Sequence, residues 1–154
     1  MKESENLTNI GMSLKKYKIK KFSNRHYSDA IALWKEEANI GVSDADQQNN
    51  INIYLKKNKG LSFVATHNNK IVGTILCGTD WRRGYINHFI VKKQYRNQGI
   101  GTELLIKSLN QLKSINISRC YIFIYSNNKK GIKYWQKVGF QLRTDLHAMS
   151  NHTF

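Results

Sequence analysis

Residues 85–105 constrain the fold more than any other segment, because a short basic turn joins a strand-like run to a helix there. The sequence pattern predicts a strand over 85–91 and an amphipathic helix that begins at Gly101. A helix start carries unpaired backbone N–H groups, and the glycines at 99 and 101 allow a ligand to approach them closely. The segment is therefore typical of a site that binds a pyrophosphate.

Two common phosphate-binding motifs do not fit this segment. The GxxxxGK[ST] pattern of a Walker loop is missing from the chain, and Leu104 stands where GxGxxG requires its third glycine. Neither a Walker-type nucleotide site nor a dinucleotide-binding fold is therefore expected.

The whole pattern predicts an α/β layer with a mixed sheet, in the order βααβββαβαββ. Helices are expected to carry apolar faces at 27–34, 51–55 and 104–112, and a short helix is expected at 128–137. Strands are expected at 17–22, 61–66, 71–77, 85–91, 120–125, 140–143 and 146–149.

Composition narrows the class of protein. The chain has 154 residues, and its 25 Lys and Arg exceed its 10 Asp and Glu by 15, which suits a polyanionic ligand. However, 19 of these cations are Lys spread along the chain, which does not indicate a nucleic-acid site. Cys77 and Cys120 form no disulfide or metal pattern, and no apolar run suits a signal peptide or a membrane span. We expect a cytoplasmic protein without metal.

Two motifs, in this order, give the chain its resemblance to a family. Residues 96–101 read Arg-Asn-Gln-Gly-Ile-Gly, five residues after a strand that ends at Val91. Residues 128–140 then read Asn, a short helix with Tyr134 and Trp135, and Gly-Phe. The chain thereby resembles the GNAT superfamily of acyl-CoA-dependent N-acyltransferases over about 138 residues from Tyr17 onward. The residues before the fourth strand, with Trp135, resemble a subgroup of small bacterial acetyltransferases.

This resemblance implies a three-layer GNAT-like fold. It would have a mixed, mostly antiparallel sheet of six to seven strands with helices on both faces. Residues 1–12 would be a flexible tail, and 13–154 would form a single acetyltransferase domain. Acetyl-CoA is the implied co-substrate, and homodimers are common in the family.

The resemblance also assigns residues to the acetyl-CoA site. Two neighbouring strands of the family splay apart around acetyl-CoA, so the backbone of Phe89, Ile90 and Val91 would pair with the pantetheine arm. The amides of the basic turn would hold the pyrophosphate, and residues after the second strand would complete the site. The residues in these last two groups are Arg96, Asn97, Gln98, Gly99, Ile100, Gly101, Thr102, Asn128 and Trp135.

Two departures from the family pattern affect the expected chemistry. Trp135 replaces the Tyr that commonly protonates the leaving thiolate, and an indole N–H is no useful acid. Its neighbour Tyr134 is the alternative acid. Phe123 stands where N-terminal acetyltransferases of ribosomal proteins carry a Glu base, which argues against that substrate.

Few residues could accept the proton of an amine. Asp80, Asp46 and His88 are the candidates, and the catalytic set is Asp80, His88 and Tyr134. Strict alternation puts His88 on the opposite face of its strand from Tyr85, and the sequence leaves open which face borders the cleft. The candidates for contact with the acceptor are Asp46, Asp80, Arg82 and Arg83.

These observations predict an N-acetyltransferase that moves the acetyl group of acetyl-CoA to a primary amine by direct transfer through a tetrahedral intermediate. The acceptor is a small-molecule or protein amine, and neither a membrane nor a nucleic acid is expected as partner. The alternative is a non-catalytic module that senses acyl-CoA or binds nucleic acid through its basic surface. Transfer of a longer acyl group is a third reading.

Overall fold

The computed structural model describes residues 15–153, which divide into two compact units at 122/123. The expected tail at 1–12 lies outside the described residues, and the single domain over 13–154 stays a prediction. Within 15–153, no helix combines the length and the apolar character that a membrane crossing requires.

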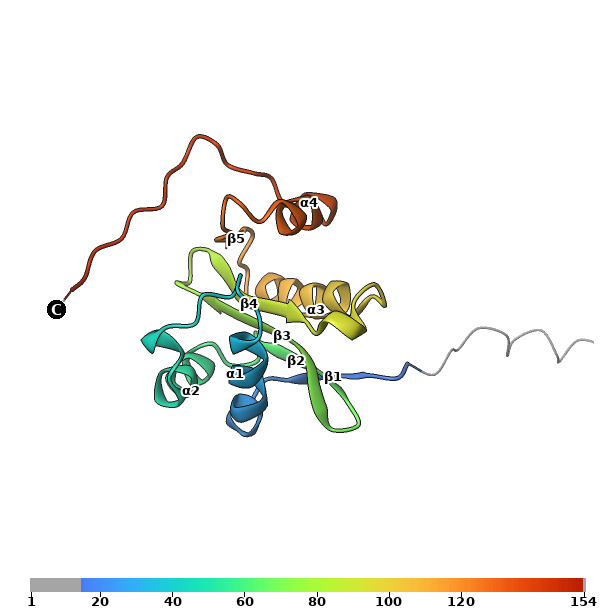
Figure 1. Cartoon of the computed structure of the whole chain (residues 1–154). Coiled ribbons are helices and arrows are strands. Elements are labelled where there is room, and N and C mark those ends of the chain that lie inside the picture. Colours follow the sequence, from blue (N-terminus) through green and yellow to red (C-terminus); the bar gives the residue numbers. More distant parts are fainter. Residues whose placement is uncertain (1–14, 154) are drawn as a thin grey trace, which may run out of the picture. The chain divides into compact units, whose positions relative to one another are not determined.

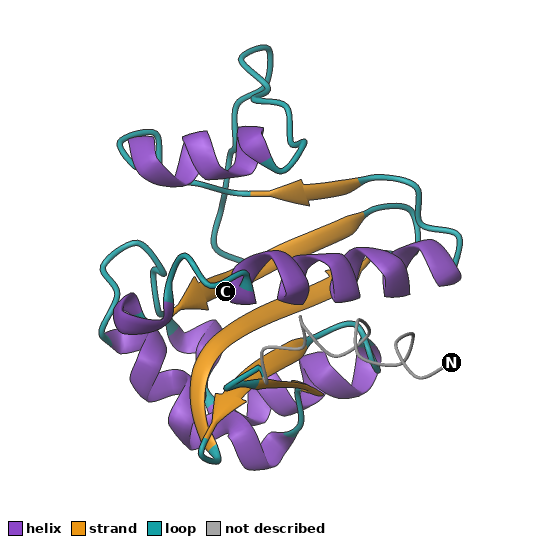
Figure 2. Ribbon diagram, turned by 90° about the vertical axis from the view of Figure 1, so that its right-hand side faces the viewer, coloured by secondary structure: helices purple, strands orange, loops and turns teal. Residues whose placement is uncertain are grey.

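The first unit, 15–122, is built on a five-stranded sheet with strand order β1-β2-β3-β4-β5. Neighbouring strands run antiparallel from β1 to β4, and β5 alone pairs with its neighbour β4 in parallel (Figure 2). The strands are β1 (Lys18–Lys21), β2 (Phe63–His67), β3 (Lys70–Thr79), β4 (Gly84–Val91) and β5 (Cys120–Ile122). The mixed, mostly antiparallel sheet is as predicted.

Helices cover both faces of this sheet, as expected. The helices α1 (Tyr27–Lys35) and α2 (Gln48–Lys57) lie on one face, and α3 (Ile100–Ser114) lies on the other (Figure 1). Gly84 of β4 shows how closely α3 approaches, because a Cβ there would collide with the Leu112 side chain. Short 3-10 turns precede α1, α2 and α3, at Asn24–His26, Asp44–Asp46 and Lys93–Tyr95.

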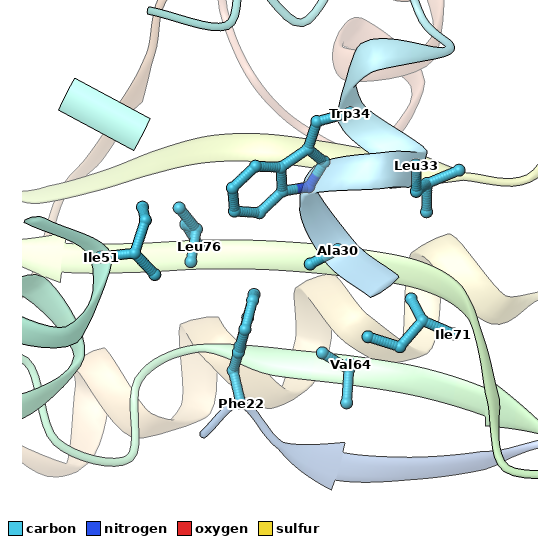
Figure 3. Packing of buried hydrophobic residues seen from close by; sticks show 8 residues of the cluster. All are labelled: Phe22, Ala30, Leu33, Trp34, Ile51, Val64, Ile71 and Leu76. Atoms are coloured by element: carbon cyan, nitrogen blue, oxygen red, sulfur yellow. The ribbon is translucent and has the colours of Figure 1, made fainter. Parts of the chain in front are cut away.

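The core under α1 centres on Trp34, which has no exposed surface. Figure 3 shows Trp34 and Ala30 of α1 in one cluster with Val64 and Leu76 of the sheet and with Phe22. Burying a large apolar side chain in this way contributes about 1.5–3 kcal/mol. This core fixes α1 over the middle of β3 and, through Trp34, over β4.

A β-bulge interrupts β4 at its centre. Thr74 of β3 pairs with Ile90 and Leu76 pairs with Asn87, so His88 and Phe89 together face the single residue between Thr74 and Leu76. The bulge puts His88 in the left-handed region, with φ of 47°. The strict alternation expected along 85–91 is therefore wrong beyond Asn87, since one extra residue changes the phase.

The parallel pairing of β4 and β5 is short. It covers Gly84–Ile86 opposite Cys120–Ile122, whereas β4 continues to Val91. The strand expected at 120–125 thus ends three residues early. The pairing stops just before the bulge.

The second unit, 123–153, contains α4 (Lys129–Lys137). The Asn128 side chain caps this helix by accepting a hydrogen bond from the Gly131 N–H at 2.9 Å. Trp135 is 9% exposed, and its ring centroid lies 4.8 Å from that of Phe140.

The final strand pair expected at 140–143 and 146–149 is wrong, because no strand forms between 138 and 153. Leu142 and Leu146 are 53% and 55% exposed, so these apolar side chains are not buried against a sheet. Two short runs cannot make a ladder without partner backbone groups. The described sheet accordingly has five strands, fewer than the six to seven expected.

Candidate active site

The start of α3 presents an open, uncapped helix N-terminus. Gly99, the N-cap residue, has φ of 82° and no side chain, and a Cβ built there would meet nothing within 4 Å. The Glu103 N–H donates to the Gly99 carbonyl, so the N–H groups of Ile100, Gly101 and Thr102 precede the first helical hydrogen bond. Such N–H groups and the helix dipole favour an anion in this position.

The turn before α3 is tied to its surroundings by Arg96. Its Nε donates to the Val91 carbonyl and its Nη2 to Glu37 Oε1, both at 2.8 Å. Ile100 is 1% exposed and belongs to the core, so its side chain does not contribute to an open surface at the helix start. The sequence-predicted residues 96–102 therefore form one continuous structure, in which the guanidinium of Arg96 has a supporting role.

At the bulge, His88 meets an acidic residue from the α1–α2 connection. His88 Nε2 lies 2.7 Å from Asp46 Oδ1, and the two side chains are only 13% and 7% exposed. Asp46 is itself fixed, because its Oδ2 accepts from the Ser43 N–H at 2.9 Å and its carbonyl accepts from the Tyr27 hydroxyl at 2.8 Å. The structure thus joins two residues that the sequence analysis considered separately.

Two buried side chains hold the backbone of the bulge. Thr74 Oγ1 donates to the His88 carbonyl at 2.8 Å, and Trp34 Nε1 donates to Thr74 Oγ1 at 2.9 Å. The Trp34 and His88 rings also meet edge to face, with centroids 4.4 Å apart. Sequence reasoning assigned Trp34 only to a core face and gave Thr74 no role, because the chain carries no local signal for these contacts.

Burial lowers the pKa of His88 from its ordinary value of 6.5, and the nearby Asp46 carboxylate opposes that shift in part. The ring is therefore neutral at pH 7. A neutral imidazole next to a carboxylate can take up a proton and be stabilised once it is charged.

A family model for the "Acetyltransferase (GNAT) family" matches residues 25–140. The chain belongs to this family. The family prediction from residues 96–101 and 128–140 is thereby confirmed, and the GNAT assignment agrees with the sheet, the helices and the open start of α3.

Curated relatives of this GNAT protein include N-alpha-acetyltransferases. N-alpha-acetyltransferase 30 of Schizosaccharomyces pombe is 31% identical over 84 residues, or 51% of this chain and 56% of that protein. The N-alpha-acetyltransferase of Sulfurisphaera tokodaii is 29% identical over 101 residues, or 57% and 60% of the two chains. The chain thus spans under two thirds of the length of each.

Solved structures share the fold over more of their length. A GNAT-family acetyltransferase from Staphylococcus aureus is 26% identical with a TM-score of 0.71, over 85% of this chain and 88% of that chain. A protein described as a predicted acetyltransferase with acetyl-CoA, from Clostridium acetobutylicum, is 22% identical with a TM-score of 0.69, over 87% and 96%. The GNAT fold is therefore shown by sequence and structure together.

Asp80 of the GNAT chain lies in the β3–β4 turn rather than beside His88. Its Oδ1 accepts from the N–H groups of Arg83 and Arg82 at 2.7 and 2.8 Å, and these hydrogen bonds lower its pKa. A carboxylate with a lowered pKa is a poor base. The turn with Asp80 comes before Gly84, the first residue of β4. About 13 Å of strand then separates Gly84 from His88.

Asn128, Tyr134 and Trp135 all belong to the second unit. The Tyr134 and Trp135 rings have centroids 5.5 Å apart, and the Asn128 amide caps α4. Their assignment to the acetyl-CoA site, and that of Phe89, Ile90 and Val91, stays a prediction.

Both cysteines are unsuited to nucleophilic catalysis. Burial raises the pKa of the Cys77 thiol and of the Cys120 thiol to about 12. Both thiols remain protonated at pH 7, so neither is a thiolate that could carry an acetyl group. Among residues 15–153, no group of three or more metal-binding side chains comes together.

Proposed function

We propose that this chain is an N-acetyltransferase that transfers the acetyl group of acetyl-CoA to a primary amine. The observation that carries the proposal is the buried His88–Asp46 pair at the bulge of β4, directly beyond the point where β4 and β5 stop pairing. The protonated thiols of Cys77 and Cys120 favour direct transfer over an acetyl-enzyme.

The chain offers a fitting place for the co-substrate. The open helix start at Gly99, Ile100, Gly101 and Thr102 suits a pyrophosphate, since no side chain caps it and nothing lies near the Cβ position of Gly99. When bound, acetyl-CoA supplies a thioester whose carbonyl carbon the acceptor amine attacks. Backbone N–H groups of β4 next to the bulge would polarise that carbonyl.

His88 acts as the proton acceptor in this proposal. His88 Nε2 lies 2.7 Å from Asp46 Oδ1. In the proposed tautomer the proton is on Nε2, so that Nδ1 carries the free electron pair. Nδ1 accepts the proton that the amine nitrogen loses as its bond to carbon forms. The Asp46 carboxylate then stabilises the imidazolium while the carbon–sulfur bond breaks.

The leaving sulfur needs little assistance. A thiol of ordinary pKa, about 8.5, departs as a thiolate without a strong acid. Trp135 carries only an indole N–H, which is not an acid. Tyr134 of α4 remains the proposed donor of the proton that the thiolate finally takes up.

A protein or peptide α-amine is the acceptor that suits this site best. An α-amino group of pKa 7.7–8.0 is neutral in roughly one molecule in eight at pH 7, against about one in 2,500 for a lysine side chain. One buried neutral histidine therefore suffices for an α-amine. The relatives named N-alpha-acetyltransferases point to the same class of acceptor.

Product analysis tests this function. The protein is incubated with acetyl-CoA and two sets of peptides, one with free α-amines and one with blocked α-amines and a free lysine. We expect thiol release and acetylated product, found by mass spectrometry, with the first set. If acetyl-CoA raises the melting temperature but no peptide of either set is acetylated, the chain is an acyl-CoA-sensing module and the proposal fails.

A further inference from the structure

Two arginines converge at the end of the β4–β5 pair that lies away from the bulge. Arg83 directly precedes β4 and Arg119 directly precedes β5, and the two strands pair in parallel from Gly84 opposite Cys120. The Gly84 N–H also donates to the Arg119 carbonyl at 2.9 Å. The parallel register therefore brings the two guanidinium-bearing residues to the same edge.

Both guanidiniums act on one phenol. The positive side chains of Arg119 and Arg83 lower the pKa of Tyr121. Neither arginine takes part in any of the four ion pairs found among residues 15–153. The turn carboxylate of Asp80 accepts from two backbone N–H groups and, at 3.4 Å, from the Tyr85 hydroxyl. The two positive charges thus meet over a neutral group.

Hydrogen bonds hold the turn that carries Arg83. The Thr79 hydroxyl donates to the Arg83 carbonyl at 2.7 Å and accepts from the Trp81 N–H at 2.8 Å. Trp81 has φ of 67° and is 71% exposed, so the turn holds a large side chain out in a left-handed conformation. A strained position of this kind is retained where the surrounding contacts fix it.

This cluster shares a sheet face with His88. Tyr85 stacks on Tyr121, with ring centroids 6.1 Å apart and planes at 28°. Tyr85 and Asn87 are two residues apart on β4, and Asn87 pairs with Leu76, whose side chain packs in the α1 core. The His88 ring contacts Trp34 of the same core. The stacked tyrosines and His88 therefore both face the α1 side.

We propose that Arg83, Arg119 and Tyr121 bind a side-chain carboxylate of the acceptor peptide, about three residues after the acetylated α-amine. The spacing follows from β4, because three residues from Tyr85 to His88 span about 10 Å, and an extended peptide covers 3.3–3.6 Å per residue. The inference rests on the proposed function and names the acceptor more closely. A compact guanidinium pair suits one carboxylate, whereas nucleic acid needs a row of cations along its backbone.

A peptide series tests the inference. Peptides with free α-amines carry Glu or Gln at one of positions two to six, and kcat/KM and the dissociation constant are measured for each. We expect the Glu peptide to exceed its Gln counterpart by about tenfold at position four or its neighbour, as one charge-assisted hydrogen bond would provide. In the double variant R83Q/R119Q the Glu/Gln ratio should fall to about one, and in the exposed control Arg25→Gln it should persist.

The outcomes separate the two proposals. Turnover of all peptides with equal constants for Glu and Gln overturns the carboxylate site and leaves the acetyltransferase standing. Absence of turnover ends the acetyltransferase proposal. The carboxylate site is then tested by the ratio of the dissociation constants of the Glu and Gln peptides. Binding of a short RNA that is lost in R83Q/R119Q, without any Glu preference, overturns it in favour of nucleic acid.

Discussion

His88 occupies a backbone conformation that few residue types tolerate. At φ of 47° a side chain with a Cβ costs roughly 1–2 kcal/mol, and Asn tolerates the region better than most residues. The hydrogen bond from the Thr74 hydroxyl to the His88 carbonyl holds the backbone in this strained conformation. Asn is consequently the substitution that removes the imidazole and keeps the bulge.

The lowered pKa of His88 predicts a pH dependence of stability. Below pH 6.5 the unfolded histidine binds a proton that the buried ring does not, so the free energy of unfolding should fall as the pH drops. The loss from this one group is at most about 1.4 kcal/mol at pH 5.5. Urea unfolding of the wild type and of His88→Asn at pH 7.5 and 5.5 measures it. If the free energy of unfolding changes equally between pH 7.5 and pH 5.5 in the two proteins, His88 is not a buried, neutral histidine.

At the scale of elements, α1, β3 and β4 are joined by the hydrogen bonds from Trp34 to Thr74 and from Thr74 to His88. The apolar spacing predicts these three elements from the sequence. The bulge cannot be predicted in that way, because it depends on Thr74, which lies 14 residues before His88, and Trp34, which lies 40 residues before Thr74. Contacts over such separations leave no mark on local periodicity.

Thr74→Val tests this connection, because valine keeps the shape and removes the hydroxyl. The buried Trp34 N–H then lacks its acceptor, which should lower the free energy of unfolding by about 1–3 kcal/mol. We also expect a lower kcat for acetyl transfer, since the bulge that positions His88 loses its hydrogen bond. Thr66→Val is the control, because Thr66 is buried but its hydroxyl makes a long contact of 3.5 Å. If Thr74→Val loses no more stability and no more kcat than Thr66→Val, Thr74 does not have this role.

The start of α3 gives a second prediction for an element. Gly99→Ala and Gly60→Ala each place a Cβ at φ near 80°, so both variants should lose a similar amount of stability, roughly 1 kcal/mol. Only Gly99→Ala should also weaken acetyl-CoA binding in calorimetry, since its new methyl group occupies the open approach to the helix start. Equal affinities of the two variants for acetyl-CoA would show that the pyrophosphate does not bind at the start of α3.

For the whole molecule, the sequence predicts the family and most of the element order, since the two GNAT motifs and the apolar periodicity are local patterns. It does not predict the pairing of Asp46 with His88, because 42 residues and two helix boundaries separate them. The charge of +15 suits an anionic co-substrate as well as an acidic acceptor. Charge alone, however, indicates neither site.

The rate of acetyl transfer by His88→Asn is the most direct test of His88 as the proton acceptor. The variant should fold like the wild type, and its kcat/KM should fall about 100-fold or more, because a positioned base contributes that much. His147→Asn, a substitution at an exposed histidine of the second unit, should leave the rate unchanged. A His88→Asn protein that is folded, binds acetyl-CoA and transfers acetyl groups at the wild-type rate would contradict the assignment of His88 as the proton acceptor.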